Sequence, residues 1–203
     1  VIFDGKPLIS INLPVPGEHI VINSLAAIAV ALELDIEPKI IKTALESFKG
    51  VSRRLEVLSS SEDLVVITDY AHHPTEIKAT LRAIKEGWKD LSEEEKPKIH
   101  VVFQPHRYTR TRDNFSDFIT AFDDADTLLV SDIYAASESP IEGISAESLV
   151  NAMSLPKVRK HIGELSSASK ELEKFIEKRD IVVFLGAGSI GRSAEEYAGS
   201  LKK

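Results

Sequence analysis

The first 50 residues carry a helical hydrophobic period. Over residues 18–34 the apolar positions fall on one face and predict a buried helix; that face carries Leu25, Ile28, Ala29 and Leu32. Residues 35–50 predict a second helix, because Pro38 suits its first turn and Gly50 its end. Two short strands, residues 1–3 and 8–13, are expected around a turn at the Asp-Gly-Lys that separates them.

After Gly50 the pattern changes to an alternation of β-branched apolar runs with amphipathic segments. Strands are predicted near residues 55–58, 64–68, 99–103, 127–131, 157–161 and 181–185. Helices are predicted near residues 74–87, 111–124, 145–153, 166–177 and 189–201. This alternation favours right-handed crossovers and an α/β fold whose mostly parallel sheet is covered on both faces. In the second of these helices Phe115, Phe118, Ile119 and Phe122 share the spacing of a face that packs on a sheet.

Polar loops follow four of the predicted strands. They read DYAHHPTE from Asp69, QPHRYTRTR from Gln104, DIYAASESP from Asp132 and GAGSIG from Gly186. In a parallel sheet all four loops emerge at the same edge, and open α/β sheets bind ligands at the carboxyl ends of their strands. The sequence therefore predicts a site at this edge.

The glycine run at Gly186, Gly188 and Gly191 has the spacing of a dinucleotide fingerprint. That fingerprint opens a βαβ unit and needs an acidic residue about 20 positions further on. Here only 12 residues follow Gly191, and no strand is among them. We therefore interpret the run as a tight strand-to-helix turn whose backbone N–H groups line the site, and keep a nicotinamide-dependent oxidoreductase as the alternative.

The segment QPHRYTRTRD carries Arg107, Arg110 and Arg112 where a helix is expected to begin. Cations are unfavourable at a helix N-terminus, so their presence there favours a bound anion over a solvated basic turn. Arginine offers paired donors to a carboxylate or a phosphate.

Three further groups of polar residues are candidates for binding. The segment DYAHHPTEI places Asp69, Tyr70 and His72 before a helix, where contacts to a substrate are favoured over a metal because adjacent histidines rarely converge on one ion. The arginine pair in GVSRRLEVL is equally compatible with a basic linker. His19 and Asn23, four residues apart, share a helix face and alone indicate only packed polar groups.

Composition narrows the class of protein. The chain has 203 residues and no cysteine, and the lack of cysteine excludes disulfides and thiolate metal sites. The net charge of -7 disfavours general nucleic-acid binding. No apolar run reaches the roughly 18–20 residues that cross a bilayer, and no secretory signal stands at the start, so we expect a cytoplasmic protein. The start within a strand-like run, without methionine, leads us to expect a fragment of a longer chain.

Six segments occur in the order found in the Mur ligase family, which the chain resembles over nearly its whole length: GEHIVINSLAAIAVAL, GVSRRLEVL, DYAHHPTEI, FQPHRYTRTRD, DIYAASESP and GAGSIG. The resemblance implies that residues 1–50 are the end of a central ATPase domain and that residues 51–203 are a Rossmann-like, three-layer C-terminal domain. The family's phosphate-binding motif G-x-x-G-K-[ST] does not occur in these 203 residues, so we expect the chain to be inactive alone.

The resemblance also implies a reaction. ATP, with Mg²⁺ held mainly by residues upstream in the family, converts the carboxylate of UDP-N-acetylmuramate into an acyl phosphate, and the amino group of L-alanine displaces the phosphate. By matched position, Tyr70, His72, Arg107 and Arg110 surround L-alanine, and the last three are the catalytic candidates. His19, Asn23, Arg54 and Asp69 are the candidates for ATP. The implied partner is the rest of the ligase chain, with no metal ligand in this part.

Two further alternatives stay open. A sister ligase of the family attaches a recycled tripeptide to the same sugar, but it has a different sequence where this chain has FQPHRYTRT. A non-enzymatic module that senses an amino acid would bind L-alanine with no role for Arg54 or Asp69.

Overall fold

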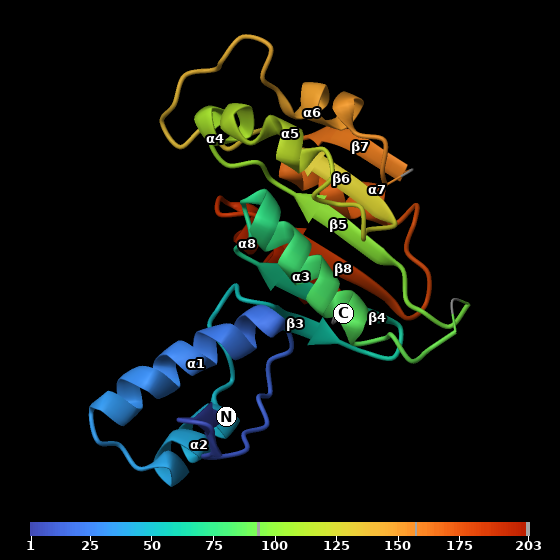
Figure 1. Cartoon of the computed structure of the whole chain (residues 1–203). Helices are drawn as coiled ribbons and strands as arrows, with labels where there is room; N and C mark the ends of the chain where they lie inside the picture. Colours follow the sequence, from blue (N-terminus) through green and yellow to red (C-terminus); the bar gives the residue numbers. More distant parts are fainter. Residues whose placement is uncertain (93, 157, 202–203) are drawn as a thin grey trace. The chain divides into compact units, whose positions relative to one another are not determined.

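The fold was analysed in a computed structural model that describes residues 1–92, 94–156 and 158–201 (Figure 1). The chain divides into two compact units, Val1–Val51 and Ser52–Lys203.

The first unit is a hairpin followed by two helices. Strand β1 (Ile2–Phe3) pairs antiparallel with β2 (Lys6–Pro7) across a tight turn in which both central residues have positive φ. The strand predicted over residues 8–13 is wrong: the turn pairs Ile2 with Pro7, and residues 8–13 form no strand in the structure. Helices α1 (Glu18–Glu33) and α2 (Pro38–Ser47) confirm the two predicted helices.

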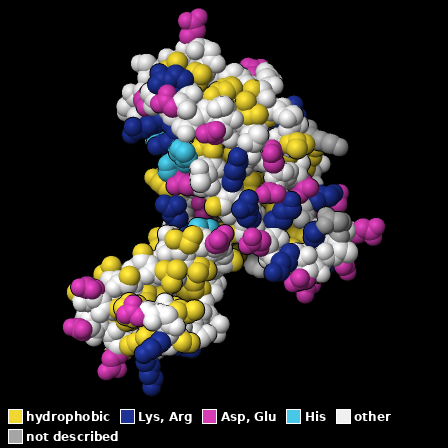
Figure 2. Space-filling view, in the orientation of Figure 1, with side chains coloured by type: hydrophobic (Ala, Val, Ile, Leu, Met, Phe, Trp, Pro, Cys, Tyr) yellow, Lys and Arg dark blue, Asp and Glu magenta, His cyan; other side chains and the backbone are white. Residues whose placement is uncertain are grey.

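The prediction that the first helix is buried is wrong for this unit. Of its apolar face only Ile28 is buried, whereas Leu25 is 45% exposed and Leu32 is half-buried. Figure 2 shows hydrophobic side chains gathered over α1. The physical reason is size, since one short helix and a hairpin cannot cover a helix that is apolar over most of its surface. No helix in the described part of the chain has both the length and the apolar character needed to cross a bilayer.

The second unit alternates strands and helices as predicted. Its strands are β3 (Glu56–Ser60), β4 (Leu64–Asp69), β5 (Ile99–Phe103), β6 (Thr127–Ser131), β7 (Val158–Gly163) and β8 (Asp180–Leu185). Its helices are α3 (Pro74–Glu86), α4 (Tyr108–Asp113), α5 (Phe115–Phe118), α6 (Ala146–Ala152), α7 (Ala168–Leu172) and α8 (Ile190–Ser200), with a 3₁₀ turn at Leu165–Ser167. Residue 157 of the strand predicted over 157–161 lies outside the described residues.

The strands form one six-stranded sheet in the order β3-β4-β8-β5-β6-β7. Only β3 is antiparallel to its neighbour, and β4, β8, β5, β6 and β7 run parallel. This confirms the mostly parallel α/β fold and brings the ends of β4, β5, β6 and β8 to one edge of the sheet. β8, the last strand, lies between β4 and β5, so the loops after those two strands flank the glycine turn.

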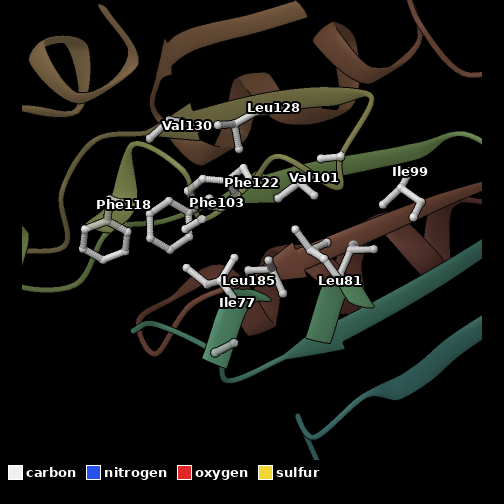
Figure 3. Close-up of a cluster of buried hydrophobic side chains, with 14 of the residues drawn as sticks. Ile77, Leu81, Ile99, Val101, Phe103, Phe118, Phe122, Leu128, Val130 and Leu185 are labelled. Atoms are coloured by element: carbon white, nitrogen blue, oxygen red, sulfur yellow. The ribbon is translucent and has the colours of Figure 1, made fainter. Parts of the chain in front are cut away.

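Helices cover both faces of the sheet, because alternate residues of each strand point to opposite sides. On one face α3, α5 and α6 pack on β5 and its neighbours, with Phe103 lying 5.0 Å from Phe122 and 5.6 Å from Phe118 between ring centroids (Figure 3). On the other face α7 and α8 pack on Val182 and Phe184 of β8. These two buried layers hold the strand ends, and therefore the site, in a fixed arrangement.

Two predicted helices differ from the structure. The helix expected over 111–124 begins earlier, at Tyr108, and breaks at Asn114, whose side-chain amide donates to the carbonyl of Arg110 at 2.9 Å. An asparagine that bonds the preceding turn competes with the helical backbone, which explains the break. The aromatic face is still buried, since Phe118 and Phe122 are at most 1% exposed. The helix expected over 166–177 is reduced to Ala168–Leu172 after the 3₁₀ turn.

Candidate functional site

The loops that follow β4 and β5 come together at the carboxyl edge of the sheet. The ring of His72, from the first loop, lies 6.2 Å from the ring of His106, from the second, between centroids. His106 in turn stacks on Tyr134, from the loop after β6, at 5.4 Å and an interplanar angle of 18°. Figure 2 shows histidine and basic side chains close together on this unit near α4. The three loops therefore share one surface.

Asp69 fixes the loop after β4. Its carboxylate is 4% exposed and accepts backbone N–H groups of Leu55 and Ala71, each at 2.7 Å. A buried carboxylate is stable only when such donors compensate its desolvation. Its structural function is thus to hold the turn that presents Tyr70 and His72.

His72 is held in one orientation by the same loop. Its Nδ1–H donates to the carbonyl of Tyr70 at 2.8 Å, and its ring makes an edge contact with the Tyr70 ring at 5.3 Å. With Nδ1 as the donor, Nε2 of a neutral ring carries the free lone pair. The His72 side chain is 18% exposed, so this nitrogen belongs to a partly desolvated group.

Glu76, in the first turn of α3, accepts hydrogen bonds from the backbone of the loop that carries His72. Burial opposes the ionisation of Glu76 and would raise its pKa. The carboxylate is stabilised by more than this, because it accepts the N–H groups of His72 and His73 at 3.0 and 3.2 Å and lies near the His72 and Arg54 charges. Its pKa is therefore lowered. The carboxylate also suits the positive end of the α3 dipole.

The loop after β5 is anchored to the loop after β6. Arg107 adopts a positive φ of 73° and its N–H donates to the carbonyl of Tyr134 at 2.8 Å. Glu138 accepts both the N–H and the hydroxyl of Thr109, at 2.9 and 2.6 Å. These bonds fix the backbone of Arg107, whose exposed guanidinium has no hydrogen bond or ion pair to any residue that the structure describes.

Arg110 contacts the histidine of its own loop. One terminal nitrogen lies 3.0 Å from Nδ1 of His106 and donates to its carbonyl at 3.2 Å. Burial lowers the pKa of His106, and the Arg110, His72 and Arg107 charges lower it further. His106 therefore accepts the Arg110 proton donor in its neutral form, and Arg110 keeps donors available for another acceptor.

The helix-dipole argument for these arginines is wrong for two of them. Arg107 is the residue before α4, but Arg110 and Arg112 fall in its last turn, where cations are favourable. The sequence reasoning placed the start of the helix three residues too late. Arg112 pairs with Asp113 at 2.7 Å on the surface, as a solvated basic residue would. The case for Arg107 and Arg110 therefore rests on the convergence of the loops.

The glycine run is a tight strand-to-helix turn, as predicted. A side chain at Gly186 would meet the Gln104 carbonyl at 2.8 Å, and one at Gly188 would meet the Tyr134 ring at 2.8 Å. The side chain of Arg53 fills the turn, with one terminal nitrogen donating to the carbonyls of Gly186 and Gly188 at 2.6 and 3.3 Å. The glycines thus serve close packing within the protein, which removes the observation that motivated the dinucleotide alternative.

The four candidates for ATP lie in both units. His19 and Asn23 lie one turn apart on α1 in the first unit, and Arg54 and Asp69 belong to the second. Arg54 is exposed and its guanidinium lies 5.4 Å from the Tyr70 ring. The nucleotide function of all four stays a prediction.

Sequence reasoning missed Arg53, His106, Tyr134 and Glu138 as parts of this surface. All four stand within motifs singled out above, but only the fold shows which side chain of each motif lies at this surface. Together with Arg107 and Arg110, they form an edge rich in guanidinium and imidazole groups, which suits a small anionic ligand. Among the described residues, no group of three or more histidine or acidic side chains is placed to hold a metal ion.

Comparisons with known proteins agree with this fold. Residues 53–188 match the protein family described as "Mur ligase, glutamate ligase domain". The UDP-N-acetylmuramate--L-alanine ligase of Desulfotalea psychrophila is 46% identical over 194 residues, which cover 95% of this chain and 41% of that protein. The crystal structure of UDP-N-acetylmuramate-alanine ligase from Thermotoga maritima superposes with a TM-score of 0.81 at 29% identity, covering 99% of this chain and 42% of that one.

A murein peptide ligase from Psychrobacter arcticus shares the fold with a TM-score of 0.66 at 22% identity, over 98% of this chain and 40% of that one. The chain spans about two fifths of the length of the curated relatives that it matches. The family match covers two thirds of the chain, including the loops after β4, β5 and β6 and the start of the glycine turn. The chain therefore belongs to the Mur ligase family, of which it carries the glutamate ligase domain.

Proposed function

We propose that this chain is the amino-acid-binding part of an ATP-dependent ligase that joins L-alanine to the carboxylate of UDP-N-acetylmuramate in peptidoglycan precursor synthesis. The names of the relatives at 43–46% identity support this assignment. The observation that carries it is the convergence of His72, His106 and the arginine loop on one edge of the sheet.

L-alanine has two groups for the site to recognise. Its carboxylate would bind Arg107 and Arg110, because guanidinium groups offer paired donors to planar anions. Arg107 is exposed and Arg110 is half-buried, and both follow β5. The amino group would then point towards Tyr70 and His72, across the 6.2 Å between the two histidine rings.

The amine must be neutral to attack an acyl phosphate. In the proposed reaction its nitrogen forms a bond to the acyl carbon, the C–O bond to phosphate breaks, and the proton leaves the nitrogen. His72 is suited to accept that proton at Nε2, because its Nδ1–H is committed to the Tyr70 carbonyl. The fixed loops hold the amine in place, which lowers the entropic cost of the reaction.

ATP would supply the phosphoryl group. The exposed Arg54 suits a phosphate contact, whereas Asp69 already binds two backbone N–H groups and would need a further lone pair for a ribose. The described residues include no group of three or more histidine or acidic side chains that could hold Mg²⁺. In this proposal Mg²⁺ and the phosphate-binding loop belong to the part of the ligase that this sequence does not contain.

Calorimetric titration of the chain with L-alanine tests the proposal. We expect millimolar binding that needs the carboxylate, so L-alaninamide should bind at least tenfold more weakly. Arg107→Gln and Arg110→Gln should each reduce the affinity about tenfold or more, since each removes a charged hydrogen bond worth roughly 1.5–3 kcal/mol. Arg112→Gln is the matched control, because Arg112 pairs with Asp113 on the surface. Equal binding of L-alanine and L-alaninamide would contradict the proposal.

A further inference from the structure

Arg53 sits between the glycine turn and the loop that carries the proposed alanine site. Its side chain fills the turn so closely that a Cβ at Gly191 would lie 2.7 Å from its Nε. One terminal nitrogen donates to the carbonyls of Gly186 and Gly188 at 2.6 and 3.3 Å. The guanidinium carbon lies 4.8 Å from the centre of the Tyr70 ring. One residue therefore contacts two loops that are more than a hundred positions apart.

The backbone of Arg53 is fixed as firmly as its side chain. Its φ is +57°, its N–H donates to Oε2 of Glu56 at 2.6 Å, and its carbonyl accepts the N–H of Tyr70 at 2.7 Å. A left-handed conformation is costly for a residue with a side chain and persists only when its surroundings enforce it. The carbonyl thus ties Arg53 to the loop that carries Tyr70, and the N–H ties it to Glu56 at the start of β3.

The guanidinium has an unusual set of partners for a cation. Carbonyl oxygens and an aromatic face hold it, and its buried Nε–H has no acceptor among the described residues. An unpaired buried donor is costly, so the carbonyl and ring contacts are what hold this side chain in place. A lysine ammonium could also donate to both carbonyls from its single nitrogen, but only the extended guanidinium places a second part of the group, its central carbon, over the Tyr70 ring at the same time.

From this geometry we propose that Arg53 is a positioning residue for the amino-acid site. It packs the glycine turn against the ring of Tyr70, and Tyr70 orients His72 through the ring contact at 5.3 Å and the carbonyl bond to Nδ1. Arg53 does not touch the amino acid and acts through these two side chains. The inference rests on the proposed function, because it assigns Tyr70 and His72 to L-alanine.

The test compares Arg53→Met and Arg53→Lys with the control Arg192→Met, which removes an exposed arginine of α8. NMR spectra of the chain report the ring protons of Tyr70 and the Cε1–H of His72, and calorimetry reports the dissociation constant for L-alanine. We expect Arg53→Met to shift both sets of signals and to weaken L-alanine binding at least tenfold. Arg53→Lys, which keeps the charge but has no guanidinium plane to lie over Tyr70, should regain less than half of the lost affinity on a logarithmic scale. Arg192→Met should stay within twofold of the wild type.

The outcomes separate this inference from the proposed function. The positioning function is overturned if the ring signals of Tyr70 and His72 do not move in Arg53→Met, or if this variant binds L-alanine within twofold of the wild type. Full recovery of the affinity by Arg53→Lys overturns it as well. A wild-type chain that does not bind L-alanine overturns the proposed function instead, and the ring signals of Tyr70 and His72 then decide whether Arg53 positions them. If Arg53→Met does not fold, the same comparisons are made with Arg53→Lys alone.

Discussion

Replacing Gly186 by alanine tests the interpretation that the glycine run serves packing within the protein. Gly186 has a φ of +146°, which residues with a Cβ rarely adopt. The added carbon would lie 2.8 Å from the carbonyl oxygen of Gln104 and 3.1 Å from Cγ2 of Ile190. The Gln104 backbone cannot yield easily, because its N–H is bonded to Leu185 and the residue is 6% exposed.

The expected loss of stability has two parts. A non-glycine residue in such a backbone region costs about 1–3 kcal/mol. Forcing an extra carbon against a fixed neighbour costs about 1–3 kcal/mol more. We therefore expect Gly186→Ala to lower the free energy of unfolding of the second unit by about 2–6 kcal/mol, which for a unit of about 150 residues lowers Tm by roughly 4–24 °C.

Tryptophan fluorescence during urea unfolding is a direct assay for this loss. Trp88 is the only tryptophan of the chain and belongs to the second unit, so its signal reports that unit. The matched control is Gly199→Ala in α8, where an added carbon meets no atom within 4 Å. In a helix that change should raise stability by up to about 1 kcal/mol. The reasoning is refuted if the two alanine variants unfold at the same urea concentration.

Three further predictions concern the core, a histidine and the acid response. Phe122→Ala removes a fully buried ring and should lower the free energy of unfolding of the second unit by about 3–5 kcal/mol. The same change at an exposed aromatic residue should lower the free energy of unfolding by less than about 1 kcal/mol. NMR titration should find the pKa of His106 below its ordinary value of 6.5, mainly because of burial, and Arg110→Met should raise it. Glu171 accepts hydrogen bonds from two lysines, which lower its pKa to about 2. The stability that its carboxylate gives the folded chain is therefore complete above the ordinary pKa of 4.5 and is lost as the pH falls towards 2. Glu171→Gln should destabilise the chain at pH 7 and not at pH 2.

Most of the sheet could be predicted because its strands are buried on both faces. IHVVF and DIVVFL are short apolar runs between polar loops, and such runs predict central parallel strands without any knowledge of their neighbours. The order of the strands was beyond reach, since the insertion of β8 between β4 and β5 depends on contacts between distant parts of the chain. That insertion brings Gln104 and Arg53 to the glycine turn.

The sequence identified the motifs that form the candidate site, but not every side chain of those motifs that lies there. The arginine pair in GVSRRLEVL was identified, but the resemblance directs attention to Arg54, whereas the structure shows Arg53 turned into the glycine run and Arg54 exposed. A positive φ at Arg53 decides this difference, and a sequence does not reveal it. The end of the helix expected over 111–124 was misplaced as well, because the bond from Asn114 to Arg110 ends α4 after six residues.

The most direct test of the central claim follows the side-chain Nε–H signals of Arg107 and Arg110 in ¹⁵N-labelled protein as L-alanine is added. We expect both signals to shift and saturate together with L-alanine and not to respond to ethylamine, which has no carboxylate. The signals of the His72 ring should shift at the same time. Saturable binding of L-alanine that leaves both arginine signals in place would contradict the claim.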